Sequence, residues 1–138
     1  MPTKRDLLIS IKPRYADMIF DGTKTVELRR QAPKMAAGDQ MIIYVSSPRM
    51  ELAGSAKITG IQSDTPQKMW RKISQISGIT KAEFDKYFEG ATQAVAIEIE
   101  EAQKFLKPLA LEDLKKKHGI QPPQSFRYVE HLALSRST

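Results

Sequence analysis

Three charged residues that could do chemistry follow a glycine turn closely in the stretch DGTKTVELRR: Lys24, Glu27 and Arg29. Because side chains alternate between the faces of a strand, we expect Glu27 and Arg29 on one face and Lys24 on the other. A carboxylate and a guanidinium at this spacing, roughly 6–7 Å apart, can pair or hold one ligand from two sides. The stretch predicts an acid/base set or an anion clamp, with an exposed surface ion pair as the structural alternative.

Other polar side chains stand where the sequence predicts strand ends. Lys12 precedes Pro13, which suits a first helical turn, and free N–H groups at a helix start favour an anion. Hydroxyl and guanidinium groups at strand ends can hold a base or a phosphate, although Ser-Ser-Pro is also common turn chemistry. The strand ends contribute six more candidate binding residues: Tyr44, Ser46, Ser47, Arg49, Ser125 and Arg127.

The amino-acid composition limits which kinds of catalytic and metal-binding sites the chain can form. The chain has no cysteine, which excludes disulfides, thiol nucleophiles and thiolate metal sites. His118 and His131 fall in different expected elements without other ligands at metal spacing, so we predict neither a metal nor a cofactor. The apolar stretch near the N-terminus is too short for a signal peptide or a membrane span, and the expected location is cytoplasmic. A net charge of +6 favours polyanionic partners.

Hydrophobic periodicity predicts the elements that position these residues. We expect strands at 7–11, around Val26, and at 41–45, 52–61, 93–105 and 126–129. We expect helices at 13–22, 65–78, 80–90 and 109–118, with capping signals at Thr65-Pro66 and at Thr80 with Glu83. The two central helices form an insertion between strands, which indicates an α+β fold. The 138 residues suit a single domain, 1–138, with a frayed tail at roughly 134–138.

Several segments of the chain resemble the ASCH domain family, in the family's order and over nearly the whole length. They are residues 8–15, 21–30, 38–39, 44–48, 77–90 and 122–128. The resemblance implies a PUA-like small curled β-barrel with flanking helices, in a superfamily where RNA binding is frequent. By the same analogy a polar cleft would collect Lys12, Lys24, Glu27, Arg29, Tyr44, Ser46, Ser47, Ser125 and Arg127, with Arg49 nearby.

Two chemistries are associated with relatives that this chain resembles. One branch is similar to amidohydrolases of N4-acetylcytidine that use Gly-x-Lys-Thr-x-Thr; Lys24 matches the lysine, and Glu27 replaces the second threonine. A second branch is described as ribonucleolytic through a tyrosine, a lysine and a serine, of which Tyr44 and Ser125 match two. The lysine position falls at Met50, beside an arginine. For an enzyme, the expected catalytic residues are Lys24, Glu27, Tyr44 and Ser125.

Three interpretations follow from these residues and this resemblance. The first is a nucleic-acid-binding module that holds RNA or a modified nucleoside in a basic cleft. The second is a metal-independent hydrolase of the same ligands, with Glu27 and Lys24 as the acid/base pair and Arg29 stabilising charge. The third is a regulator that senses a small molecule. The sequence leaves open which ligand is bound, whether it is turned over, and the oligomeric state.

Overall fold

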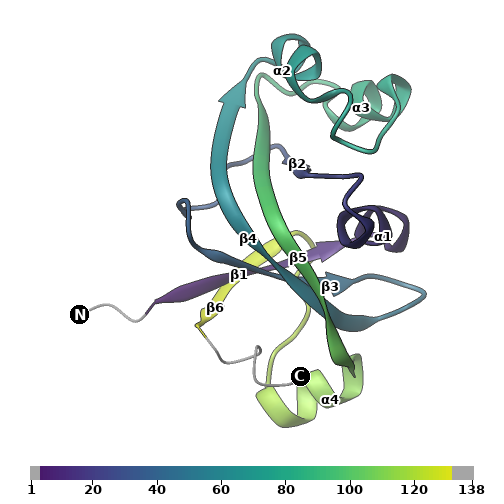
Figure 1. The fold of residues 1–138 in the computed structure, drawn as a ribbon, viewed down its shortest axis with the longest axis vertical. Coiled ribbons are helices and arrows are strands. Elements are labelled where there is room, and N and C mark those ends of the chain that lie inside the picture. Colours follow the sequence, from purple (N-terminus) through teal and green to yellow (C-terminus); the bar gives the residue numbers. More distant parts are fainter. Residues whose placement is uncertain (1–3, 132–138) are drawn as a thin grey trace.

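Six strands form one mixed sheet in the order β2-β5-β4-β3-β1-β6 in the computed structural model, which describes residues 4–131. Neighbouring strands pair antiparallel, except that β1 and β3 are parallel. Figure 1 shows β4 and β5 as a long bent pair that runs from one end of the molecule to the other. The strands are β1 (Arg5–Ile11), β2 (Val26–Arg29), β3 (Gln40–Val45), β4 (Glu51–Asp64), β5 (Ala94–Ala110) and β6 (Phe126–Glu130).

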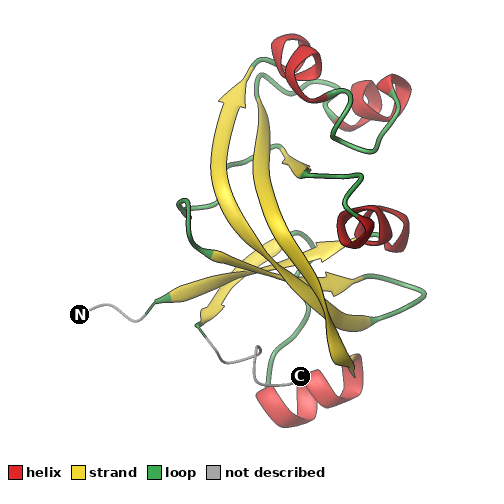
Figure 2. Cartoon of the chain, in the orientation of Figure 1, coloured by secondary structure: helices red, strands yellow, loops and turns green. Residues whose placement is uncertain are grey.

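Four helices lie within the described residues: α1 (Pro13–Asp21), α2 (Pro66–Ile73), α3 (Lys81–Tyr87) and α4 (Leu111–His118). Helices α2 and α3 are inserted between β4 and β5 at one end of the sheet, whereas α4 lies at the opposite end (Figure 2). The predicted insertion and the α+β class are therefore confirmed. No helix within residues 4–131 is long and apolar enough to cross a membrane.

Local capping explains where the helices begin and end. The Thr65 side chain accepts from the backbone N–H of Lys68, and Thr80 with Glu83 forms the full capping box that the sequence predicts. Helix α2 ends at Ile73, earlier than expected. The following segment turns back instead, and Gly78 adopts a φ of 71° where an added Cβ would lie 2.8 Å from the sulfur of Met18. The left-handed backbone favours glycine here, and any larger residue would also have to displace the Met18 side chain.

The sheet buries residues on both faces. In β1, Leu7 and Ile9 join a core cluster with α1 and the middle of β5, while Leu8 joins a second cluster with Ile42, Tyr44 and Leu52. The short strand β2 also alternates: Val26 and Leu28 pack against α2 and α3 in a third cluster. This packing leaves the other face of β2 for polar side chains.

The sheet is curled but not closed into the small β-barrel that the resemblance implies. Strands β2 and β6 are its outer members, and no backbone pairing joins them within residues 4–131. Register shifts in β4 bend the sheet, as bulges do, so that its edges approach each other. A side chain bridges the remaining gap: Arg29 of β2 donates to the Ser10 carbonyl at 2.9 Å and to the Ser125 hydroxyl at 3.1 Å. Strand β2 ends at Arg29, so this edge of the sheet is joined to the other edge by the Arg29 guanidinium and not by backbone hydrogen bonds between strands.

Candidate functional site

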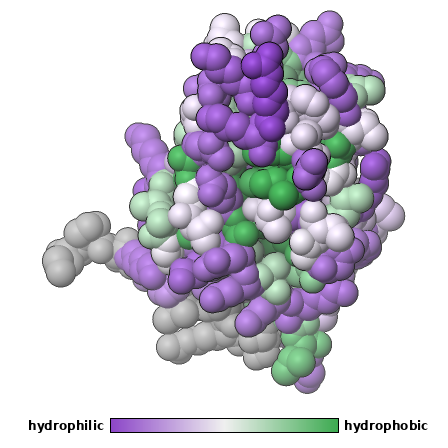
Figure 3. All heavy atoms as spheres, turned by 45° about the horizontal axis from the view of Figure 1, so that its top comes forward, coloured by the Kyte–Doolittle hydropathy of each residue, from purple (hydrophilic) through white to green (hydrophobic). Residues whose placement is uncertain are grey.

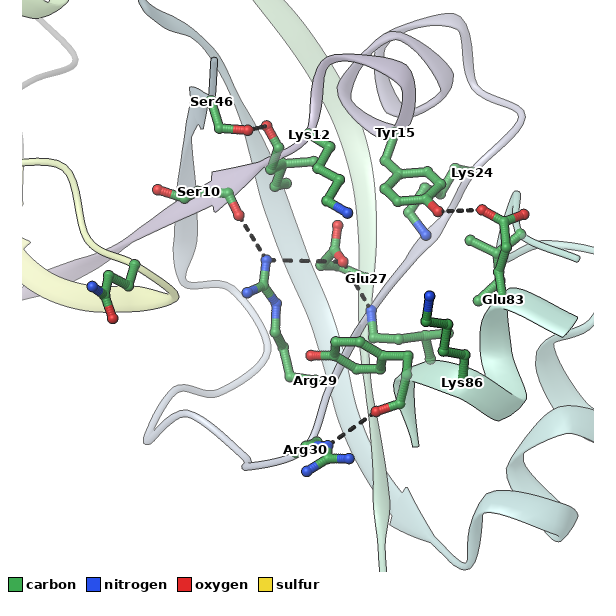
Figure 4. Close-up of a pocket in the computed structure, with 15 residues that line it drawn as sticks. Ser10, Lys12, Tyr15, Lys24, Glu27, Arg29, Arg30, Ser46, Glu83 and Lys86 are labelled. Atoms are coloured by element: carbon green, nitrogen blue, oxygen red, sulfur yellow. Dashed lines mark hydrogen bonds and ion pairs between the residues drawn. The ribbon is translucent and has the colours of Figure 1, made fainter. Parts of the chain in front are cut away.

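An open pocket of about 740 Å³ lies where the ends of β1 and β2 meet α1 and α3 (Figure 4). Hydrophilic side chains cover most of the face seen when the α2–α3 end is turned forward, around a hydrophobic middle (Figure 3). Five cations and two carboxylates line the pocket, a balance that favours anionic ligands. The cations are Lys12, Lys24, Arg29, Arg30 and Lys86, and the carboxylates are Glu27 and Glu83.

Glu27 lies at the centre of this pocket, between Arg29 on one side and Tyr15 and Lys24 on the other (Figure 4). Only 7% of the residue is exposed. One carboxylate oxygen, Oε1, accepts from the backbone N–H of Leu28 at 3.2 Å and lies 3.9 Å from Arg29 Nη2. The other, Oε2, is buried and has no hydrogen-bond partner among the described residues. A buried acceptor without a donor is uncommon in folded proteins and needs an explanation.

Arg29 stands beside Glu27, on the face of β2 that strand alternation predicts. Its two terminal nitrogens hold the sheet edges together through Ser10 and Ser125. Its third nitrogen, Nε, is buried and without a hydrogen-bond partner in residues 4–131. The two neighbouring side chains therefore contain one buried acceptor and one buried donor without partners in the described part of the chain.

Lys24 enters the same pocket, which corrects the prediction that it faces away from Glu27. Strand β2 begins only at Val26, so strand alternation does not apply to Lys24. The lysine is 2% exposed, and its ammonium group donates to the backbone carbonyl of Ser77. Burial lowers the pKa of Lys24, an effect that the nearby Glu27 carboxylate opposes. A buried lysine facing a carboxylate is suited to proton transfer or to ligand binding.

Tyr15 and Glu83 form one wall by joining α1 to α3. The Tyr15 hydroxyl donates to Glu83 Oε2 at 2.6 Å. Burial and this hydrogen bond raise the pKa of Tyr15 to about 12, and the bond from Tyr15 is the main reason that the pKa of Glu83 falls to about 2. Glu83 is also held by Arg14 at 3.1 Å and by the capping box with Thr80. Both carboxylate oxygens of Glu83 have partners within the fold, so we assign this residue a structural role.

Two lysines at the rim differ from these paired groups. Lys12 and Lys86 are exposed, and neither ammonium group forms a hydrogen bond or ion pair with another described residue. Figure 4 shows both ammonium groups directed toward the space around Glu27. Tyr87 also lines the pocket, is 42% exposed, and rests edge-on against Phe88 at 4.8 Å between ring centroids. Free cations beside an exposed ring can hold a phosphate and a planar group.

The structure brings together about half of the residues that the sequence singled out. Ser46 lines the pocket with Lys12, Lys24, Glu27 and Arg29, and Ser125 borders it through its bond from Arg29. The others lie outside the lining: Tyr44 is 4% exposed within the second core cluster, Ser47 is in an exposed turn, Arg49 is paired with Asp17, and Arg127 is exposed near Gln121. Their roles stay predictions.

Several lining residues were not singled out from the sequence as ligand contacts. Tyr15 fits a helical hydrophobic pattern, and Glu83 is explained locally by its capping box. Lys86 and Tyr87 carry no signal of their own, because they reach the pocket only when α3 docks beside β2. Within residues 4–131, no cluster of histidine, cysteine, aspartate or glutamate could hold a metal ion.

Comparisons with known proteins agree with this fold. An ASCH domain-containing ribonuclease of Zymomonas mobilis is 29% identical over 130 residues, covering 94% of this chain and 87% of that protein. A crystal structure of ASCH from Zymomonas mobilis matches with a TM-score of 0.88 and 28% identity, over 96% of this chain and 92% of the other. The crystal structure of its serine-to-alanine variant matches with a TM-score of 0.89 and 27% identity, over 99% of this chain and 96% of the other.

A second relative is described as a ribosomal protein and not as a ribonuclease. The large ribosomal subunit protein uL22 of Ureaplasma parvum is 27% identical over 128 residues, which is 93% of this chain but 40% of that protein. The ASCH domain model itself matches residues 9–108, most of the chain. On that match, supported by the sheet and helices described above, this chain belongs to the ASCH domain family.

Proposed function

We propose that this ASCH domain binds single-stranded RNA and that the pocket around Glu27 holds one of its nucleotides. The observation that carries the proposal is the presence of Lys12 and Lys86, two exposed and unpaired cations, at the rim of a pocket with unpartnered polar atoms inside. The description of the Zymomonas mobilis relative as a ribonuclease supports RNA as the polyanion.

The chemistry of the pocket suits a nucleotide from an unpaired strand. Single-stranded RNA is recognised through bases that leave the stack and lie against aromatic rings, while cations follow the phosphates. Tyr87 offers an exposed ring, and a stacked base contributes roughly 1–3 kcal/mol. In this proposal Lys12 and Lys86, whose ammonium groups are directed into the pocket in Figure 4, contact the phosphates on either side of that base.

Binding of a labelled single-stranded RNA, measured by fluorescence anisotropy over a series of salt concentrations, tests this proposal. We expect the affinity to fall with salt, with a logarithmic slope of about −0.7 for each phosphate neutralised. The matched duplex RNA should bind more weakly, because its bases are stacked and cannot enter the pocket. An affinity that is independent of salt, or equal for duplex and single strand, would contradict the proposal.

RNA cleavage without a metal is a second candidate, favoured by one alignment in the sheet. Ser10 of β1 pairs with Tyr44 of β3, and its backbone N–H donates to the Ser125 carbonyl, so Tyr44 and Ser125 flank one residue of the pocket wall. Burial raises the pKa of Tyr44, which suits a proton donor better than a base. Glu27 is the base that this mechanism requires.

Incubation of RNA with the chelator-treated protein, followed by mass spectrometry, separates cleavage from binding. Cleavage that persists in chelator and is lost in Tyr44→Phe and Ser125→Ala would assign catalysis to these residues. If the RNA stays intact and the variants bind it as tightly as the native protein does, the protein binds RNA without cleaving it. A parallel incubation with N4-acetylcytidine tests the amidohydrolase alternative, for which Lys24 and Glu27 are the candidate residues.

A further inference from the structure

One oxygen of the carboxylate at the centre of the pocket has no hydrogen-bond partner in the part of the chain that the structure describes. Glu27 Oε2 has no partner within residues 4–131, although the side chain is only 9% exposed. The cations around it are directed partly to other acceptors: Lys24 uses one of its three donors on the Ser77 carbonyl, and the terminal nitrogens of Arg29 donate to Ser10 and Ser125. An ionised carboxylate only accepts hydrogen bonds, so a ligand that pairs with Oε2 must bring an N–H or O–H group.

A phosphate is a poor occupant for this central position. It carries negative charge, as Glu27 does, and like charges at close range in a buried site repel strongly. The free cations Lys12 and Lys86 stand at the rim instead. The charge distribution therefore places phosphates outside and an uncharged, donor-bearing group inside.

The base of a nucleotide is such a group, but the bases differ in what they present. Cytosine, adenine and guanine each carry an exocyclic amino group, and glutamate is a known acceptor from the amino group of cytosine. Uracil has a single N–H between two carbonyl oxygens, and at least one of these oxygens would approach the carboxylate. The neighbouring residue Arg29 has an unpartnered donor, Nε, which would serve the ring nitrogen or carbonyl next to an amino group.

We propose that Glu27 is the base-reading residue of this pocket: it accepts a hydrogen bond from the exocyclic amino group of one RNA base and thereby selects against uracil. This inference rests on the proposed RNA binding. It adds an orientation, with the base inside and the phosphates on the lysine rim, and it adds a specificity.

A set of uridine oligomers that differ only at the central nucleotide tests the inference. We expect cytosine, adenine or guanine at that position to raise the affinity of the native protein about tenfold over uridine. In Glu27→Gln the side-chain amide can donate to a uracil carbonyl as well as accept from an amino group. The discrimination should therefore fall to about twofold or less, a result that a purely structural role for Glu27 does not predict.

Two controls keep the outcome interpretable. A central N4,N4-dimethylcytidine removes the donor from the RNA and leaves the protein unchanged, so it should bind no better than uridine even if Glu27→Gln fails to fold. Lys86→Ala should weaken all oligomers by the same factor, because phosphate contacts carry no base information. No binding of any oligomer overturns the proposed function itself. Equal binding of all central bases, or discrimination that survives in Glu27→Gln, overturns the base-reading role and leaves RNA binding intact.

Discussion

The pocket around Glu27 and the turn after β3 place charges beside the same helix, α1, but satisfy them differently. In the turn, both terminal nitrogens of Arg49 donate to the two carboxylate oxygens of Asp17 at 2.8 Å. In the pocket, Glu27 Oε2 and Arg29 Nε have no partners, and the Lys12 and Lys86 ammonium groups are unpaired among the described residues.

This difference distinguishes residues that serve the fold from residues kept for a ligand. The sequence marked both Arg49 and Lys12 as candidate contacts, since both are cations near expected strand ends. In the structure Arg49 already has its anion. A buried polar atom without a partner destabilises the free protein, typically by about 1–3 kcal/mol, and a bound ligand can recover that energy. Unsatisfied groups are therefore the better guide to the site.

The largest effect is expected from removing the unpaired lysines together. Lys12→Ala with Lys86→Ala should reduce RNA affinity at least about tenfold and lower the salt slope by about 0.7 per lysine. Titrations at several salt concentrations measure both quantities. The matched control is Lys115→Ala with Lys116→Ala on α4, at the opposite end of the sheet. An equal loss in the control would mean that the whole basic surface, rather than the pocket, binds RNA.

Replacing the buried lysine should affect both function and stability. Lys24→Met should weaken RNA binding several-fold and lower the free energy of unfolding by about 1–3 kcal/mol, because it leaves the Ser77 carbonyl without its donor and removes a cation from beside the buried Glu27 carboxylate. Urea unfolding and anisotropy measure the two effects. A loss of more than about 3 kcal/mol would instead make Lys24 essential to the fold.

The same variant has a pH signature. Since burial holds the folded-state pKa of Lys24 below its ordinary value of 10.5, the unfolded chain binds the proton more readily. Native stability should therefore gain a contribution as pH rises from the folded pKa to 10.5, and Lys24→Met should lack that contribution.

A smaller effect is expected at the wall that joins α1 to α3. Tyr15→Phe removes the main cause of the low Glu83 pKa, which should rise from about 2 toward its ordinary value of 4.5. Because a depressed carboxyl pKa stabilises the fold above 4.5 and loses that effect as pH falls toward 2, the variant should unfold at a higher pH in acid. Carboxyl carbon shifts in an NMR titration report the pKa directly. Arg14→Ala should raise the pKa of Glu83 less than Tyr15→Phe does, since the charge of Arg14 contributes least to the lowered pKa.

The smallest effect is expected in the satisfied turn. Arg49→Ala removes an exposed ion pair and should change the free energy of unfolding by less than about 1 kcal/mol. RNA affinity should stay within about twofold of the native value. A large loss of affinity would show that Arg49 leaves Asp17 to contact RNA, and would remove the contrast between the turn and the pocket.

Local pattern in the chain was sufficient to place Glu27 and Arg29 on one face of a strand and to locate the capped starts of α2 and α3. Strand alternation and capping act over two or three residues, so no distant information is needed. The order of motifs along the chain likewise indicated the ASCH family, which the match over residues 9–108 establishes.

Tertiary structure decided which of those residues share a pocket. Helix α3 brings Lys86 and Tyr87 to β2, and the carbonyl of Ser77 draws Lys24 inward across 53 positions of sequence. Tyr44 lies at a strand end as expected, yet its side chain is buried in the second core cluster and does not line the pocket. Burial, partner choice and the open edge bridged by Arg29 all depend on contacts between distant segments, which no local pattern records.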